Sequence, residues 1–86
     1  MKTVKLVYFA RLREALGVSE ENIEIGDSVN DIATLTRWLR ERGENWAKAL
    51  DSKSAVRAAV NLDMAQPNTK IADKDEVAFF PPVTGG

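Results

Sequence analysis

The fold of this chain is decided by one stretch, SVNDIATLTRWLRERG, which spans residues 28–43. Apolar residues recur in it at helical spacing, at positions Val29, Ile32, Leu35 and Leu39. This spacing predicts an amphipathic helix that buries one face in the core. Ser28 is the predicted N-cap, Asp31 suits the positive end of the helix dipole, and Gly43 is the predicted C-cap.

Strand patterns flank this helix on both sides. Residues 4–9 and 22–25 alternate before it, and strand-forming residues occupy 56–61 and 76–80 after it. Short helical turns are predicted over residues 11–16 and near residues 46–50, and turns over residues 67–68 and 73–75. The order strand, strand, helix, strand, strand predicts an α+β domain in which a mixed sheet packs on one main helix.

Composition excludes several classes of function. The 86 residues suffice for one domain, and the lack of Cys and His removes disulfides and the ordinary zinc and general-base sites. Asp73, Asp75 and Glu76 are interpreted as turn chemistry, so no metal is predicted. Twelve basic and thirteen acidic residues give a net charge of -1, which argues against nucleic-acid binding. Without a signal-peptide pattern or an apolar run of about 20 residues, we expect a cytoplasmic protein that does not enter a membrane.

The first and the last predicted strand along the chain, residues 4–9 and 76–80, together predict a docking surface. If Val77 and Phe79 point into the core, alternation turns their neighbours outward, and the same holds for the first strand. The outward residues would be Val7, Phe9, Ala78 and Phe80. If the two strands are adjacent, these side chains form an apolar patch suited to a partner, and Arg13 is a further candidate contact. In the alternative interpretation the register is inverted and both phenylalanines belong to the core.

The chain ends in a predicted flexible tail, residues 81–86, attached to a domain formed by residues 1–80. The tail comprises Pro81, Pro82, Val83, Thr84, Gly85 and Gly86. The prolines favour an extended start, and the glycines can thread a narrow channel. A partner can activate the unhindered Gly86 carboxylate as an acyl adenylate, which a sulfur donor or an amine then attacks. The sequence contains no phosphate-binding loop, so activation requires another protein. The alternative is an inert, frayed terminus.

The ending VAFFPPVTGG, residues 77–86, resembles the C-terminal signature of the small subunit of molybdopterin synthase, the MoaD family. Residues 8–14 (YFARLRE) and 58–61 (AAVN) match other family segments, with less specificity. The resemblance implies a ubiquitin-like β-grasp fold. It also implies a sulfur carrier, which is a non-catalytic subunit rather than an enzyme.

The same resemblance implies a mechanism for the tail. An ATP-using, ubiquitin-activating-like enzyme adenylates Gly86, which then becomes a thiocarboxylate. The tail inserts into the large synthase subunit, within a heterotetramer, and delivers sulfur to cyclic pyranopterin monophosphate. Phe80 and Phe9 match contact positions in the partner interface. The chain itself is expected to bind no cofactor, because ATP is used by the activating partner.

Two alternatives stay open. The carrier chemistry could serve thiamine biosynthesis or a ubiquitin-like modifier, since related carriers share the Gly-Gly ending. The chain could also be an interaction module of β-grasp fold with an inert tail. Residues 62–70 carry no motif and predict no role.

Overall fold

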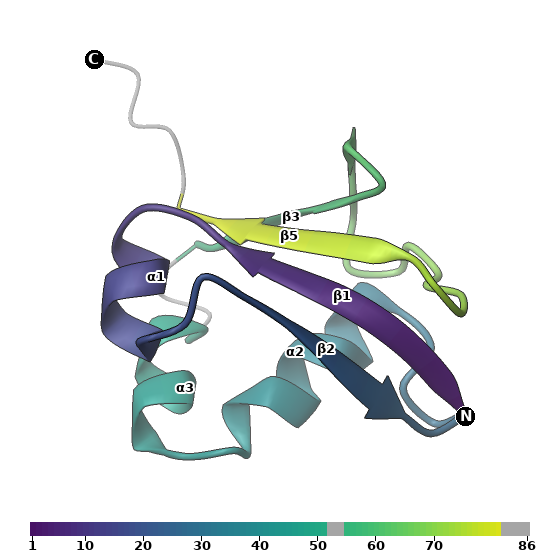
Figure 1. Cartoon of the computed structure of the whole chain (residues 1–86), viewed down its shortest axis with the longest axis horizontal. Helices are drawn as coiled ribbons and strands as arrows, with labels where there is room; N and C mark the ends of the chain where they lie inside the picture. The colour runs from purple at the N-terminus through teal and green to yellow at the C-terminus, as the bar shows by residue number, and fades with distance from the viewer. Residues whose placement is uncertain (52–54, 82–86) are drawn as a thin grey trace.

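The computed structural model describes residues 1–51 and 55–81, and residues 52–54 and 82–86 lie outside the described part. The elements, in chain order, are β1 (Lys2–Tyr8), α1 (Arg11–Leu16), β2 (Glu20–Ile25), α2 (Ile32–Arg40), α3 (Glu44–Ala49), β3 (Arg57–Val60), β4 (Asp63–Met64) and β5 (Glu76–Phe80). The strands form a five-stranded sheet in the order β2-β1-β5-β3-β4 (Figure 1). Only the β1–β5 pair is parallel among the described strand pairs. This confirms the predicted α+β architecture with a mixed sheet.

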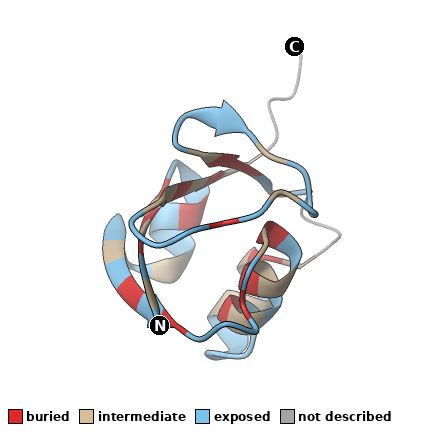
Figure 2. Ribbon diagram, turned by 90° about the vertical axis from the view of Figure 1, so that its right-hand side faces the viewer, coloured by how far each residue is buried: buried red, intermediate tan, exposed pale blue. Residues whose placement is uncertain are grey.

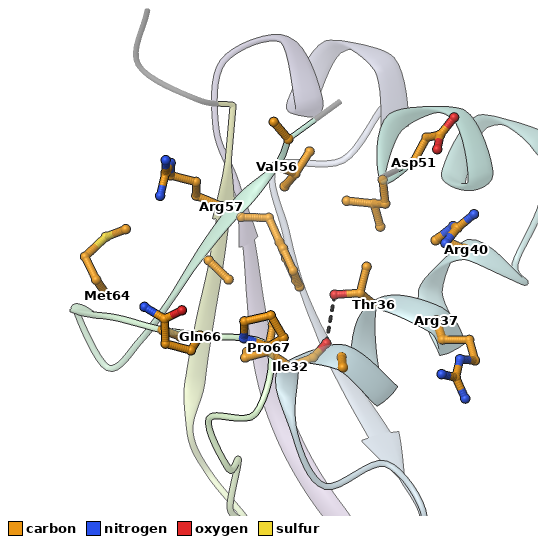
Figure 3. Close-up of a pocket in the computed structure, with 16 residues that line it drawn as sticks. Ile32, Thr36, Arg37, Arg40, Asp51, Val56, Arg57, Met64, Gln66 and Pro67 are labelled. Carbon is orange, nitrogen blue, oxygen red and sulfur yellow. Dashed lines mark hydrogen bonds between the residues drawn. The ribbon is translucent and has the colours of Figure 1, made fainter. Parts of the chain in front are cut away.

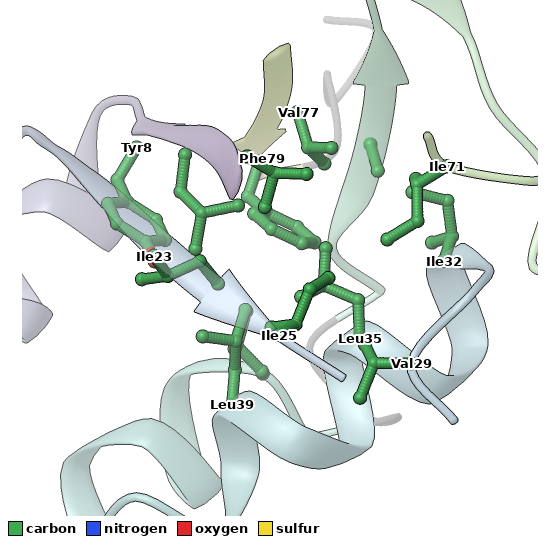
Figure 4. Close-up of a cluster of buried hydrophobic side chains, with 14 of the residues drawn as sticks. Tyr8, Ile23, Ile25, Val29, Ile32, Leu35, Leu39, Ile71, Val77 and Phe79 are labelled. Carbon is green, nitrogen blue, oxygen red and sulfur yellow. The ribbon is translucent and has the colours of Figure 1, made fainter. Parts of the chain in front are cut away.

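The core lies between the inner face of the sheet and the helices. Along β1, Val4, Leu6 and Tyr8 are buried, as the alternating pattern predicts. Helix α2 contributes Ile32, Leu35 and Leu39 from the opposite side, and these side chains point toward the strands (Figure 4). Buried residues accordingly lie on the facing surfaces of sheet and helices (Figure 2). The apolar stripe of residues 28–43 therefore has its predicted role.

The N-terminus of α2 differs from the prediction. The N-cap is Asp31 rather than Ser28, because the Asp31 carboxylate accepts the Thr34 backbone N–H at 2.8 Å. The Thr34 hydroxyl accepts the Asp31 N–H at 3.1 Å, which completes a reciprocal capping box. Hydrogen bonds from the Thr34 backbone and side chain lower the pKa of Asp31. Val29 is buried but precedes the helix.

The C-terminus of α2 also differs from the prediction. Its C-cap is Glu41, and Gly43 instead serves as the N-cap of α3. The main helix is followed by a second, short helix, which confirms the short helical turn predicted after it. The predicted turn near residues 46–50 is α3 itself, and it contacts both α1 and α2.

A polar and aromatic cluster joins the sheet to the bend between α2 and α3. The Tyr8 hydroxyl donates to Glu21 at 2.9 Å, and Arg42 donates to both Glu21 carboxylate oxygens at 2.8 and 3.1 Å. The Arg42 guanidinium also lies 4.3 Å from the Trp46 ring centroid and 5.6 Å from that of Trp38. Both tryptophans are partly buried and pack against the core.

These contacts shift the pKa values of the cluster. Burial raises the pKa of Tyr8, and the Glu21 carboxylate adds to the effect. Burial also works to raise the pKa of Glu21, but the hydrogen bonds from Arg42 and Tyr8 outweigh it and lower that pKa. Glu21 is therefore charged at neutral pH, and Tyr8 is neutral there chiefly because it is buried.

The β3–β4 hairpin was missed from the sequence. Val60 pairs with Asp63, so Asn61 and Leu62 form a two-residue turn, with positive φ angles of 49° and 74°. The Asn61 side chain accepts the Glu76 N–H at 3.0 Å and donates to Asp75 at 2.9 Å. The hairpin is thereby tied to the turn that begins β5.

Candidate functional site

A row of apolar side chains crosses the outer face of four strands. Val7 pairs with Ala78, Ala78 pairs with Ala59, and Ala59 pairs with Met64. Residues that are directly paired across strands point to the same side of a sheet, so these four share the face opposite the core. The row ends at Met64, which is 61% exposed. We call these four residues the outer row.

Two phenylalanines lie next to the outer row, at the end of the sheet where β5 stops. Phe9 is 49% exposed, and its backbone N–H donates to the Phe79 carbonyl at 3.1 Å, so it extends the pairing of β1 with β5. Phe80 is half-buried, whereas its neighbour Phe79 is only 1% exposed. This confirms the predicted register, with Phe79 inside, Phe80 outside and the two strands adjacent.

A sharp turn directs the chain from Phe9 into α1. Ala10 has φ 54° and ψ -133°, a backbone conformation that L residues rarely adopt, and Leu12 donates back to the Phe9 carbonyl at 3.2 Å. Arg13 lies on the exposed side of α1. The structure thus brings Val7, Phe9 and Phe80 to one region. The predicted role of these residues and of Arg13 in partner binding stays a prediction.

Charged residues border the outer row: Glu20 on β2 is paired with Val7, and Lys5 and Glu76 precede Val7 and Ala78, on the side away from the phenylalanines. Lys5 lies between two glutamates on neighbouring strands, at 3.4 Å from Glu20 and 3.9 Å from Glu76. All three side chains are at least two-fifths exposed, so these ion pairs contribute little to stability. They limit the apolar surface to the end of the sheet near residue 81.

The tail begins at the centre of the sheet. Strand β5 pairs with β1 on one side and with β3 on the other, so the backbone up to Phe80 is held from both sides. Pro81 is half-buried and is the last residue that the structure describes. The remaining predicted tail residues, Pro82, Val83, Thr84, Gly85 and Gly86, lie outside the described residues.

Two functional candidates were missed from the sequence, both on the β3–β4 hairpin. Met64 completes the outer row, and Leu62 is 87% exposed at the tip of the turn. The signal that could have found them is Asn61 between two apolar runs, because Asn tolerates the positive φ that a two-residue hairpin requires. The hairpin was not predicted because Leu62 occupies the second position of the turn, where glycine is usual.

The structure also has a hollow that no predicted site residue lines. It has a volume of about 430 Å³ and lies between α2 and the segments around β3 and β4. Arg57 lies on one side of it and Arg37 and Arg40 on the other, while the Thr36 hydroxyl donates to the Ile32 carbonyl at 2.8 Å (Figure 3). We assign it no role in the candidate site.

The acidic residues near β5 act in turns. Asp73 accepts the Thr3 backbone N–H at 2.7 Å, and Asp75 accepts the Ala72 N–H at 2.8 Å. Within residues 1–51 and 55–81, no three Asp or Glu residues gather closely enough to hold a metal ion. Nor does this part of the chain contain a helix long and apolar enough to cross a membrane.

Comparison with known proteins assigns the family. The sequence matches the ThiS family over residues 6–86. This chain belongs to the ThiS family. A curated relative from Escherichia coli, "Molybdopterin synthase sulfur carrier subunit", is 35% identical over 83 residues, which cover 96% of this chain and 99% of the relative. One of the same name from Chlamydomonas reinhardtii is 38% identical and covers 96% of this chain and 98% of the relative. The predicted resemblance to the molybdopterin synthase small subunit is thereby confirmed.

Similarity to a solved structure identifies the fold. A putative molybdopterin converting factor, subunit 1, from Pyrococcus furiosus has a TM-score of 0.80 and 31% identity to this ThiS-family chain. The similarity covers 96% of this chain and 100% of that one. This confirms the predicted ubiquitin-like β-grasp fold.

Proposed function

We propose that this chain is the sulfur carrier subunit of a molybdopterin synthase and acts in molybdenum cofactor biosynthesis. The observation that carries the proposal is the uncovered apolar face beside the point where β5 passes into the tail. Full-length relatives named as molybdopterin synthase sulfur carrier subunits support it. In this proposal the chain is a non-catalytic cytoplasmic subunit, and its reacting group is the Gly86 carboxylate.

The chemistry follows from a glycine at the chain end. A partner enzyme transfers AMP from ATP to the Gly86 carboxylate, which releases pyrophosphate and leaves an acyl adenylate. Sulfide supplied by the donor then attacks the carbonyl carbon and displaces AMP, so that a thiocarboxylate remains and a proton is released. This chain binds no cofactor in the cycle, and its contribution is to present the carbonyl at a defined distance from its docking surface.

The outer row, Phe9 and Phe80 form the proposed docking surface for the large subunit. Docking there buries apolar surface that is exposed in the free chain, mostly at Phe9 and Met64 and partly at Phe80, which is a favourable source of binding free energy. The tail, starting at Pro81 beside this surface, then enters the active site of the large subunit. There the thiocarboxylate sulfur is delivered to cyclic pyranopterin monophosphate.

Intact-mass spectrometry tests the proposal. We expect incubation with the adenylating enzyme, ATP and a sulfur donor to raise the mass by the difference between sulfur and oxygen. A matched chain lacking Gly86 should not transfer sulfur to the precursor even where its new terminus is modified, because it presents the carbonyl one residue short. Failure of the full chain to gain mass would contradict the carrier function. A thiocarboxylate that the large subunit cannot use would assign the chain to another sulfur pathway.

A further inference from the structure

One end of the sheet places a cation in line with the two phenylalanines of the docking surface. Arg57 on β3 is paired with Phe80 on β5, so both side chains lie on the face opposite the core. Phe9 lies on the other side of β5, where its backbone N–H donates to the Phe79 carbonyl. We call Arg57, Phe80 and Phe9 the end row, because they lie beside the outer row at the end of the sheet where β5 stops.

Arg57 is exposed and has no ionic partner in the described part of the chain. It borders the hollow next to α2, but its guanidinium lies on the far side of β3 from that helix (Figure 3). Within residues 1–51 and 55–81, the guanidinium forms no ion pair or hydrogen bond. A guanidinium offers several N–H donors in a rigid, planar arrangement that matches a carboxylate. Arg57 is therefore available to bind an anionic group of a partner.

Docking of the end row requires a partner for this charge. Burial of the Phe80 ring against another protein also removes water from the Arg57 guanidinium beside it. A charge that loses its water without gaining a partner is costly, whereas a carboxylate placed against it offsets that cost. A protein that covers Phe80 should therefore carry an acidic residue at the position that faces Arg57.

The charges on the other side of the outer row have the opposite sign. There Lys5 lies between Glu20 and Glu76, so this group carries one more negative charge than positive. The end row is positive, and this group is net negative. Apolar contacts alone do not orient a partner, because the hydrophobic effect is non-directional, whereas complementary charges fix the register of an interface.

We propose that Arg57 pairs with a carboxylate of the large subunit, and that this pair fixes the orientation in which the outer face docks. The inference rests on the proposed function, because it takes the large subunit as the partner. It adds the chemistry of the partner's surface, which is an acidic residue beside an apolar area that receives Phe80 and the outer row. In the reversed orientation the acidic residue meets Glu20 and Glu76, and the repulsion disfavours that arrangement.

Binding of the large subunit at varied ionic strength tests the pair. Between about 0.05 M and about 0.5 M salt, screening weakens the attraction between charges during the encounter. We expect Arg57→Gln to weaken binding at least about tenfold at the lowest salt, and to show a flatter salt dependence than wild type. Arg57→Lys keeps the positive charge and should keep the salt dependence.

Arg40→Gln is the matched control. Arg40 is exposed at the end of α2, on the helical side of the sheet, and its substitution changes the net charge by the same amount. This variant should bind the large subunit as wild type does. Chemical denaturation should give Arg57→Gln the wild-type free energy of unfolding, so that a loss of affinity is not a loss of fold.

Two results would overturn the inference and leave the carrier function standing. One is wild-type affinity and salt dependence in Arg57→Gln. The other is an equal loss of affinity in Arg57→Gln and Arg40→Gln, which would show an effect of net charge alone. A wild-type chain that does not bind the large subunit would instead contradict the proposed function, and this inference with it.

Discussion

The inner and outer faces of β1 and β5 differ in what covers them. On the inner face, Tyr8 and Phe79 stack at 6.0 Å between ring centroids, beneath the ion pair of Glu21 with Arg42. On the outer face, Val7 and Phe80 have water beside them. Since successive side chains of a strand point to opposite faces, one strand can stabilise the fold with one residue and bind a partner with the next. Substitutions on the two faces should therefore separate stability from binding.

Replacing Phe79, on the inner face, should have the largest effect on the free energy of unfolding. Phe79→Ala removes a ring that is 1% exposed, and we expect the free energy of unfolding to fall by about 3–5 kcal/mol. Phe80→Ala, one residue on, should cost much less, because its ring is partly hydrated in the folded chain. Chemical denaturation of both variants measures this, and equal losses would contradict the assigned faces.

Phe80→Asp, on the outer face, should affect binding of the large subunit more than stability. A carboxylate at this position would be buried against the large subunit, so we expect affinity to fall at least about tenfold, roughly 1.4 kcal/mol. Ala33→Asp is the control, because Ala33 is exposed in the first turn of α2, where a carboxylate is tolerated. Isothermal titration calorimetry with the large subunit measures both. An unchanged affinity for Phe80→Asp would remove the outer face from the interface.

The cluster under the sheet should affect stability alone. Glu21→Gln breaks the ion pair with Arg42, and we expect a loss of about 1 kcal/mol, since both side chains are partly exposed. The pKa of Glu21 is lower in the folded chain, so its contribution is present at neutral pH and disappears as the pH falls below about 4.

Thermal unfolding between pH 3 and pH 7 checks this pH dependence. The wild-type chain should lose more stability on acidification than Glu21→Gln does. Glu24→Gln, an exposed position on the same strand, should behave as wild type. Identical pH profiles for wild type and Glu21→Gln would contradict the role of the ion pair.

Met64 should give the smallest effect. It lies at the far end of the outer row on an edge strand, so Met64→Ser should weaken binding of the large subunit by roughly two- to fivefold. Leu62→Asn tests the hairpin tip separately, and it should keep the fold because asparagine suits the positive φ of the hairpin turn. If Leu62→Asn weakened binding more than Met64→Ser, the interface would be centred on the hairpin tip instead.

The sequence predicted the parts of the fold that depend on local periodicity. The alternation in β1 and β5 gave the inner and outer faces, and the stripe from Val29 to Leu39 gave α2. The predicted ends of α2 were wrong because Ser28, Asp31 and Gly43 each suit more than one cap position. Only the tertiary contacts decide which cap forms.

The site was predicted in part for the same reason. Val7, Phe9 and Phe80 followed from alternation once β1 and β5 were taken as neighbours. Met64 joins them only through Ala59 on β3, and that pairing depends on a hairpin whose turn carries Leu62 in place of glycine. Strand pairing across the sheet is not local, so the sequence pattern could not supply it.

Sulfur transfer from the loaded chain tests the central claim most directly. Thiocarboxylated wild type, Ala33→Asp and Phe80→Asp would each be mixed with the large subunit and cyclic pyranopterin monophosphate, and intact mass followed with time. We predict that wild type and Ala33→Asp return to the carboxylate mass at equal rates, while Phe80→Asp unloads several-fold more slowly at large-subunit concentrations below those that saturate wild type. Equal unloading of all three would contradict docking through the outer face.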